Sequence, residues 1–233
     1  MPVAAMTALA ATVLADARFP GGGHAHSGGV EEAVARGLLR DEDGLRSFLL
    51  GRLRTAGLVA AAFAAAAAGS AGQGDVLTVL DAELDARTPS PAQRAASRAQ
   101  GRAALRAARL AWPAPALDAL VAVHPRPHHP LLAGIVVGDP AAAAQCVAYL
   151  AVSGPASAAV RLLGLDPLAV NALLVALPVE AVAADAVRAA AGPPADLPAA
   201  GSPALDLMAE DHVAAGDPQN RRHHREQVRL FVS

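Results

Sequence analysis

The chain has 233 residues, of which 54% are hydrophobic and only 3% aromatic, so its core has to be built from Ala, Leu and Val side chains. Such side chains suit close helix–helix packing, whereas a sheet would need more β-branched and aromatic residues. The net charge of -2 argues against a general nucleic-acid binder.

The first twenty residues, MPVAAMTALAATVLADARFP, form an apolar segment that predicts a helix over residues 3–17. The segment lacks the basic start of a secretory signal peptide, and Asp16 and Arg18 follow soon after its apolar part. We therefore expect a cytoplasmic protein.

Residues 19–37, FPGGGHAHSGGVEEAVARG, place five glycines and two histidines before a Glu-Glu pair. A phosphate-binding P-loop ends in Gly-Lys-Ser or Gly-Lys-Thr, and this chain has no lysine. No strand precedes the stretch, as a dinucleotide-binding fold would require. We expect a compact turn in which glycine permits positive φ, followed by a helix that Ser27 and Glu31 begin as a capping arrangement.

The segment 55–72 is uncharged and mostly alanine, so it has to be weighed as a membrane span. Alanine and three glycines make it too weakly hydrophobic for that role. The prediction is a core helix and no membrane partner.

Capping residues followed by proline predict four helix starts, at Ser90-Pro91, Asp139-Pro140, Asp166-Pro167 and Ser202-Pro203. Asp41 before two acidic residues predicts another. The helices expected lie near residues 3–17, 29–39, 42–68, 74–86, 91–111, 115–123, 130–137, 140–152, 155–163, 167–176 and 179–191. We predict an all-α, single-domain multi-helix bundle of about ten helices over residues 1–192, followed by a Pro/Gly-rich connector and a flexible C-terminal tail over 193–233.

Five arginines recur along the helix predicted at 91–111 and fall within an arc of about 120°: Arg94, Arg98, Arg102, Arg106 and Arg109. No acidic residue lies between Thr88 and Leu117 to neutralise them. Two interpretations remain open. The stripe is either a solvated helix face or a surface that docks an acidic partner, because guanidinium groups bind carboxylates bidentately.

Histidines cluster at three places, and two or three imidazoles from such clusters can hold a divalent transition metal. The clusters are His24 with His26, His124 with His128 and His129, and His212 with His223 and His224. The alternative is that these are uncommitted surface histidines. The only cysteine, Cys146, lies in an apolar run and is predicted to be a buried, inert thiol.

The stretch FPGGGHAHSGGVEEAV resembles the signature of the urease accessory protein F family (UreF), which reads roughly Leu-Pro-x-Gly-Gly-Phe-Ala-His-Ser-x-Gly-Leu-Glu. The matching residues are Pro20, Gly22, Gly23, Ala25, His26, Ser27, Gly29 and Glu31. His24 stands where the family has phenylalanine, and Val30 where it has leucine.

Three further stretches resemble the same family in the same order. QRAASRAQGRAAL keeps Arg94, Ser97, Gly101 and Arg102 of a Glu-x-Arg-x-x-Ser-x-x-x-Gly-Arg helix, and SAAVRLLGLDP keeps Arg161 and Leu162 of an Ala-Val-Arg-Leu segment. The ending RLFVS is similar to the family's closing Arg-Leu-Phe-x-Ser, which implicates Arg229, Leu230, Phe231 and Ser233 in partner binding.

The resemblance implies a non-enzymatic, all-helical and dimeric scaffold in nickel delivery to apo-urease. It implies a bridge between a D/H-type accessory protein and the nickel-carrying GTPase accessory protein G, with an effect on GTP hydrolysis. No tightly bound cofactor is expected, although nickel in transit would make His26 a candidate metal contact. We expect the tail to become ordered on binding the D/H-type partner.

Two other hypotheses remain open. One is a helical metal-binding or sensing protein in which the histidines form a defined site. The other is an enzyme of unrecognised type that uses His26, Ser27 and Glu31.

Overall fold

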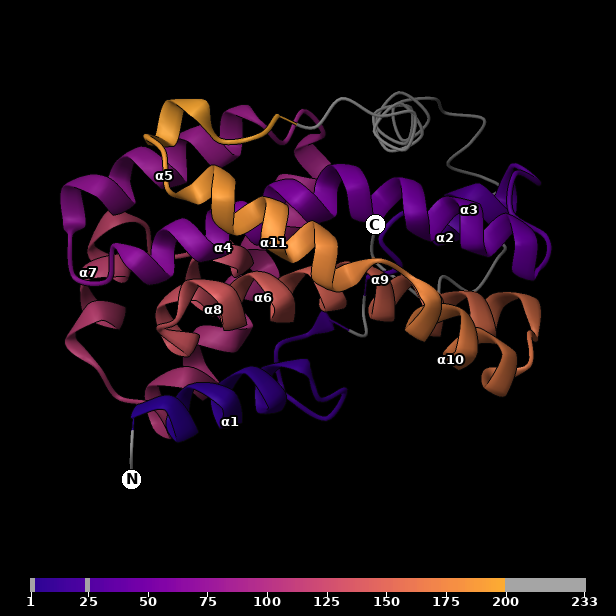
Figure 1. Cartoon of the computed structure of the whole chain (residues 1–233), viewed down its shortest axis with the longest axis horizontal. Coiled ribbons are helices and arrows are strands. Elements are labelled where there is room, and N and C mark those ends of the chain that lie inside the picture. The colour runs from indigo at the N-terminus through magenta and orange to yellow at the C-terminus, as the bar shows by residue number, and fades with distance from the viewer. Residues whose placement is uncertain (1–2, 24–25, 200–233) are drawn as a thin grey trace.

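The computed structural model describes residues 3–23 and 26–199, and these residues form helices and connecting turns without a β-strand (Figure 1). The predicted all-α fold is therefore confirmed for the described part of the chain. The predicted tail lies, from residue 200 onward, outside the described residues, and so does the cap expected at Ser202.

The helices follow one another with short connections. They are α1 (Val3–Ala15), α2 (Val30–Ala35), α3 (Glu42–Arg52), the π-helical segment η2 (Leu53–Gly57), α4 (Leu58–Gly69), α5 (Gly74–Ala86), α6 (Pro91–Ala111), α7 (Pro115–Val123), α8 (His129–Val137), α9 (Pro140–Leu163), α10 (Pro167–Ala176), α11 (Val179–Ala190) and the 3₁₀ turn η3 (Pro194–Asp196).

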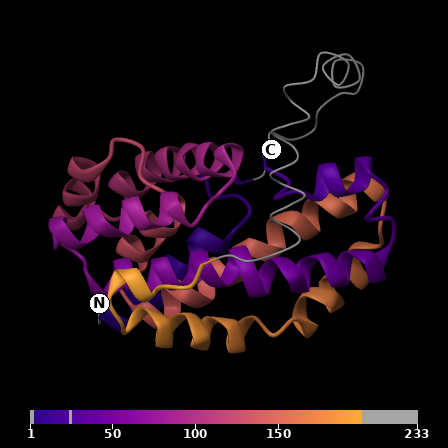
Figure 2. The same cartoon turned by 90° about the horizontal axis from the view of Figure 1, so that it is seen from above.

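Helix α4 is the centre of the core, packed against α8, α9 and α11. Figure 2 shows α11 on one face of the molecule and α6 on the opposite face, with the long run of α3 and α4 between them. Alanine dominates the buried face of α4, and this allows close approach: a Cβ at Gly134 of α8 would lie 2.2 Å from the carbonyl oxygen of Ala64. Small side chains thus let α4 and α8 pack closely, beside a core that also buries many leucines.

The predicted helix caps at Asp41, Ser90, Asp139 and Asp166 are confirmed. Each side chain accepts a hydrogen bond from a backbone N–H in the first turn of its helix, at 2.8 Å for Asp41 and Asp139, 3.0 Å for Asp166 and 3.4 Å for Ser90. These bonds satisfy amide groups that a helix start leaves without a partner.

The prediction of two helices separated near residue 153 is wrong, because α9 runs unbroken from Pro140 to Leu163 with Pro155 inside it. Proline has no N–H to donate to the carbonyl four residues earlier, which is that of Ala151. The Nε–H of Arg52 donates to this carbonyl instead, at 2.8 Å. A side chain from α3 therefore satisfies the group that would otherwise favour a break.

Two helical runs, Glu42–Gly69 and Pro140–Leu163, are long and apolar enough to cross a membrane by length and composition alone. In this structure 50% and 44% of their most apolar stretches are buried against other parts of the domain. The segment predicted as a core helix, now α4, contributes to both clusters of buried residues.

The thiol of Cys146 is also buried, and burial raises its pKa to about 12, as expected of an inert cysteine.

The folded domain extends beyond the predicted boundary at residue 192. Leu197 is buried in the core, and Arg87, the residue after α5, donates hydrogen bonds to the carbonyl oxygens of Leu197 (3.1 Å) and Ala195 (2.8 Å). The Pro/Gly-rich composition suggested a loose connector, but an arginine more than 100 residues away anchors its first part.

Candidate functional site

A cavity of about 690 Å³ lies in the described part of the molecule, and its size is within the range of ligand sites. Residues of the glycine stretch line it together with parts of α3, α4, α6, α9 and α10. The three described stretches that carry the family resemblance meet here, since His26, Ser97 and Arg161 all line the cavity. We take this cavity as the candidate functional site.

The glycine stretch is a compact turn, as predicted. Gly22, Gly28 and Gly29 have φ of 73°, 62° and 94°, in the left-handed region that side chains other than glycine rarely adopt. The turn lies against α6, because a Cβ at Gly21 or Gly22 would lie within 4 Å of the Ala104 or Ala103 methyl group respectively. Glycine is therefore required at these three positions by backbone conformation, whereas the contacts with the two alanine methyl groups are at ordinary van der Waals distance.

Arg52 joins the glycine stretch to α9. Besides the bond to Ala151, its Nη1 donates to the carbonyl oxygen of Gly28 at 3.0 Å. A Cβ at Gly28 would lie 2.9 Å from Pro155 and 3.1 Å from the Arg52 guanidinium carbon, so only glycine leaves room for this contact. Burial lowers the pKa of Arg52 to about 10, which still leaves a cation at neutral pH.

Ser27 is fully buried, and its hydroxyl oxygen accepts a hydrogen bond from the Glu31 backbone N–H at 3.3 Å. The N-cap residue of α2 is Gly29, without a side-chain cap, so the predicted arrangement is present only as this bond from Ser27 to the first turn. The burial of Ser27 leaves the enzyme hypothesis without an accessible serine nucleophile. His26 is half-buried and lines the cavity. Its neighbour His24 lies outside the described residues, so the proposed pairing of these two histidines stays a prediction.

Ser97 and Gly101, one turn apart on α6, form the surface on which residues 127–129 lie. A Cβ at Gly101 would lie 2.0 Å from the carbonyl oxygen of Pro127 and 3.0 Å from the backbone nitrogen of His129. The Ser97 hydroxyl oxygen accepts a hydrogen bond from that same N–H at 3.3 Å. The spacing of serine and glycine in this helix thus has a packing explanation.

His128 is completely buried, with Nε2 2.9 Å from the Asp85 carboxylate and Nδ1 3.0 Å from the Ser97 hydroxyl. Because a carboxylate only accepts, the neutral ring carries its proton on Nε2, and Ser97 donates to Nδ1. Burial lowers the pKa of His128, with Arg98 acting in the same direction and Asp85 opposing it. The Ser97 hydroxyl both donates to this ring and accepts from His129, so we interpret the chain of bonds as structural rather than catalytic.

The histidine cluster proposed at 124–129 does not form a metal site. Both ring nitrogens of His128 have partners, and Nδ1 of His124 accepts from the Arg126 backbone N–H at 3.0 Å. Only His129 faces the cavity, and burial lowers its pKa to about 4, so the imidazole is neutral. Among the described residues, no group of three His, Cys, Asp or Glu side chains is placed to hold a metal ion.

The arginine stripe of α6 divides into two kinds of side chain. Arg98 is 12% exposed and pairs with Asp81 (2.9 Å) and Asp85 (2.6 Å) of α5, so the expectation of a uniformly available stripe is wrong at this position. Arg94 donates to the carbonyl oxygens of Thr88 and Pro89, and Arg109 pairs with an exposed Asp118. Arg102 and Arg106 are exposed and make no hydrogen bond or ion pair within the described residues.

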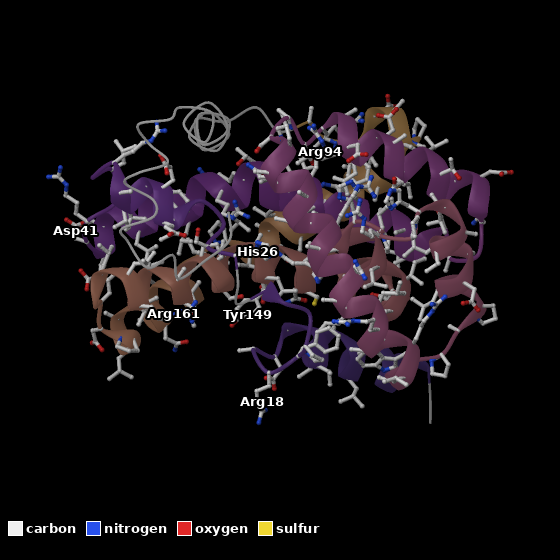
Figure 3. All side chains as sticks on the ribbon, turned by 180° about the vertical axis from the view of Figure 1, so that it is seen from behind. Arg18, His26, Asp41, Arg94, Tyr149 and Arg161 are labelled. Atoms are coloured by element: carbon white, nitrogen blue, oxygen red, sulfur yellow. The ribbon has the colours of Figure 1, made fainter. Side chains whose placement is uncertain are left out.

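Arg161 lies on α9 two turns after Ser153, and Ser157 between them accepts a hydrogen bond from its Nη1 at 3.2 Å. All three line the cavity. In Figure 3, Arg161, Tyr149 and His26 lie along the same side of the molecule, and all of them are cavity residues. The remaining predicted partner contacts, Arg229, Leu230, Phe231 and Ser233, lie outside the described residues.

Sequence reasoning missed Arg52 and His129 as cavity residues. A proline inside an apolar helical run was the available signal for Arg52, because it leaves a carbonyl that some distant donor has to satisfy. No feature of the neighbouring sequence distinguishes His129 from His128. Gly101 lets Pro127 approach α6, and in this arrangement the His128 side chain is buried while His129 lines the cavity.

The chain matches a known family along most of its length. The family model described as UreF matches residues 39–178. A protein of Mycolicibacterium vanbaalenii described as "Urease accessory protein UreF" is 45% identical over 220 residues, covering 88% of this chain and 94% of the relative. Relatives of the same description from Mycobacterium sp. (strain JLS) and Mycobacterium marinum are 46% and 44% identical, covering 85% and 91% of this chain and 91% and 98% of theirs.

Proposed function

This chain belongs to the UreF family, and we propose that it acts as a urease accessory protein, a non-catalytic scaffold in the maturation of the urease metallocentre. The observation that carries the proposal is the extent of similarity to relatives of that description, at 42–46% identity. Two features are consistent with it. The hydroxyl of buried Ser27 bonds to the first turn of α2, and that of Ser97 holds the loop before α8. The residues of the family-like stretches converge on one cavity.

As partners we propose a D/H-type accessory protein, the GTPase accessory protein G and, through that complex, apo-urease. In this arrangement the chain modulates GTP hydrolysis by its partner without binding nucleotide, since it lacks lysine and hence a P-loop. We place this assembly in the cytoplasm, without nucleic-acid or membrane partners.

We propose further that no cofactor is tightly bound and that nickel contacts the chain only in transit, with His26 as the candidate side chain. The position of His26 supports this role, because His26 lies in the glycine turn and lines the cavity.

A homodimer is the proposed oligomeric state. Helix α10 has no charged residue, and Leu168 and Val175 on it are each 80% exposed, which favours coverage by another protein surface.

The function is tested by complementation. The gene for the homologous protein is deleted in a urease-positive bacterium, and this chain is supplied on a plasmid. We expect urease activity to return, and we expect purified urease from the complemented strain to contain nickel. Expression of the full chain at wild-type levels without recovered activity would contradict the proposal, provided that the strain's own protein restores activity from the same plasmid.

Reversing the charge of the two exposed arginines of α6 tests the docking surface. We expect R102E/R106E to weaken binding to an acidic partner surface about tenfold or more at low salt, and less at high salt, because exposed charges are screened. The melting temperature should stay within about 2 °C of wild type, since surface charges contribute little to stability. Pull-down and titration calorimetry with the D/H-type and GTPase partners provide the measurement, and unchanged binding at low salt would mean that the stripe is only a solvated face.

A further inference from the structure

We propose that the contact between residues 127–129 and α6 is an acid-sensitive latch, closed at neutral pH and open at mildly acidic pH. The latch includes His129, which lines the cavity, so its opening alters the cavity wall. This regulation goes beyond the proposed function and depends on no partner protein. It rests on two neighbouring histidines that the fold holds in the neutral form at the start of α8.

The first observation is how closely residues 127–129 lie on α6. A Cβ at Gly101 would lie 2.0 Å from the carbonyl oxygen of Pro127 and 3.0 Å from the backbone nitrogen of His129, so backbone touches backbone. This contact removes the His128 side chain from water completely and that of His129 in part. A charged imidazole in either place would lose hydration that the open segment restores.

The hydrogen bonds of His128 require its neutral form. Its Nε2–H donates to Asp85 at 2.9 Å, and its Nδ1 accepts from the Ser97 hydroxyl at 3.0 Å. A proton on Nδ1 would turn this acceptor into a donor. The Ser97 oxygen would then accept from Nδ1–H as well as from the His129 backbone N–H, and the hydroxyl hydrogen would lose its acceptor. Acid therefore removes a bond that holds the segment on α6.

The charged groups around the two rings act in opposite directions. Burial and Arg98 of α6 lower the pKa of His128, whereas Asp85 and Asp81 of α5 oppose them, and the net effect is a lowered pKa. For His129, burial lowers the pKa to about 4. Within the described residues, no charged group of α1, α4, α7 or α9, which also pack on α8, contributes to either shift. The positive end of the α8 dipole disfavours a cation at both positions.

The direction of the pH effect follows from these lowered values. Opening exposes both rings, so the open form binds more protons than the closed form below about pH 6.5, and acid favours opening. For His129, a change from about 4 to the ordinary 6.5 favours opening about 30-fold more at pH 5 than at pH 7.5. Burial raises the pKa of Asp85, but hydrogen bonds from Arg98 and His128 outweigh it and hold that pKa below its ordinary value. Asp85 therefore stays ionised over this range, and the histidines respond.

Hydrogen exchange of the purified full chain tests the latch. Exchange of residues 127–133 and of α11, which contains no histidine, is followed by mass spectrometry at pH 7.5 and pH 5 and divided by the intrinsic rates. We expect the opening equilibrium of residues 127–133 to rise about 30-fold or more at pH 5. At that pH it should also exceed the opening equilibrium of α11 at least tenfold, because only this segment opens.

Two variants assign the effect to the buried pair. His129→Gln keeps a polar side chain toward the cavity but cannot titrate, so we expect it to reduce the pH effect about tenfold or more. His124→Gln is the matched control. It removes a histidine from the same connection, whose ring accepts from the Arg126 backbone N–H, and should leave the pH effect within about twofold of wild type.

Each outcome decides the question. A pH effect that His129→Gln leaves unchanged, or that His124→Gln reduces as much, would overturn the assignment to the buried pair. Opening of residues 127–133 and of α11 to the same extent at pH 5 would mean global unfolding, and would overturn the latch. A chain that shows the latch but fails to restore urease activity would contradict the proposed function alone.

Discussion

Replacement of Gly101 by alanine is expected to lower the free energy of unfolding by about 3 kcal/mol or more. The added Cβ would lie 2.0 Å from the carbonyl oxygen of Pro127 and 3.0 Å from the backbone nitrogen of His129. Both are backbone atoms, so residues 127–129 would have to move away from α6 as a unit. That movement would also break the hydrogen bonds of Ser97 to His128 and His129.

Gly51→Ala is the matched control. Gly51 also lies inside a helix, but a Cβ there meets nothing within 4 Å. Alanine is the better helix former, so this variant should gain up to about 1 kcal/mol. Urea unfolding followed by circular dichroism at 222 nm measures both effects. A Gly101→Ala variant as stable as wild type would show that residues 127–129 are not fixed on α6 as described.

The second large effect is expected at Arg98. Replacing it by glutamine removes the cation that faces Asp81 and Asp85, and should cost about 3 kcal/mol. Most of this cost comes from Asp81, whose side chain is 11% exposed and would keep a buried charge without its partner. The carboxylate of Asp85 is 42% exposed, so water screens it and its contribution is smaller.

Arg102→Gln, one turn further along the same helix face, controls for the loss of one positive charge from α6. Its exposed side chain has no ion pair within the described residues, and its removal should change stability by no more than about 0.5 kcal/mol. The double variant D81N/R98Q should recover part of the loss, because it leaves no buried charge. Thermal unfolding of the four proteins measures the set. Equal stability of the Arg98→Gln and Arg102→Gln variants would contradict the role assigned to the buried ion pair.

The two stability predictions also bear on the cavity. Ser97 and His129 line it, and both are held by the contacts that these variants disturb. Loss of partner binding in Gly101→Ala or Arg98→Gln would therefore accompany a loss of stability.

Local features of the sequence were enough to predict the helices and most of their starts. An aspartate or serine followed by proline satisfies an orphan amide and loses no needed donor, whatever the rest of the chain does, and the caps at Ser90, Asp139 and Asp166 are present. The glycine turn was predictable for the same reason, since positive φ is a property of single residues. The scarcity of aromatic and β-branched residues likewise predicted an all-α core before any contact was known.

The tertiary structure alone decided which polar groups meet across the fold. Arg98 pairs with Asp85 and Asp81, which lie 13 and 17 residues earlier in the chain. A search for acidic residues within the helix of Arg98 therefore missed both partners. Helix α9 continues through Pro155 because Arg52, 99 residues before Ala151, satisfies the freed carbonyl. His128 and His129 are neighbours in sequence, yet one is buried in a network and the other lines the cavity. Caps and φ angles depend on a few adjacent residues, whereas ion pairs and cavities depend on which helices pack together. In a core built mostly from alanine, leucine and valine, many local patterns are too alike to specify that packing.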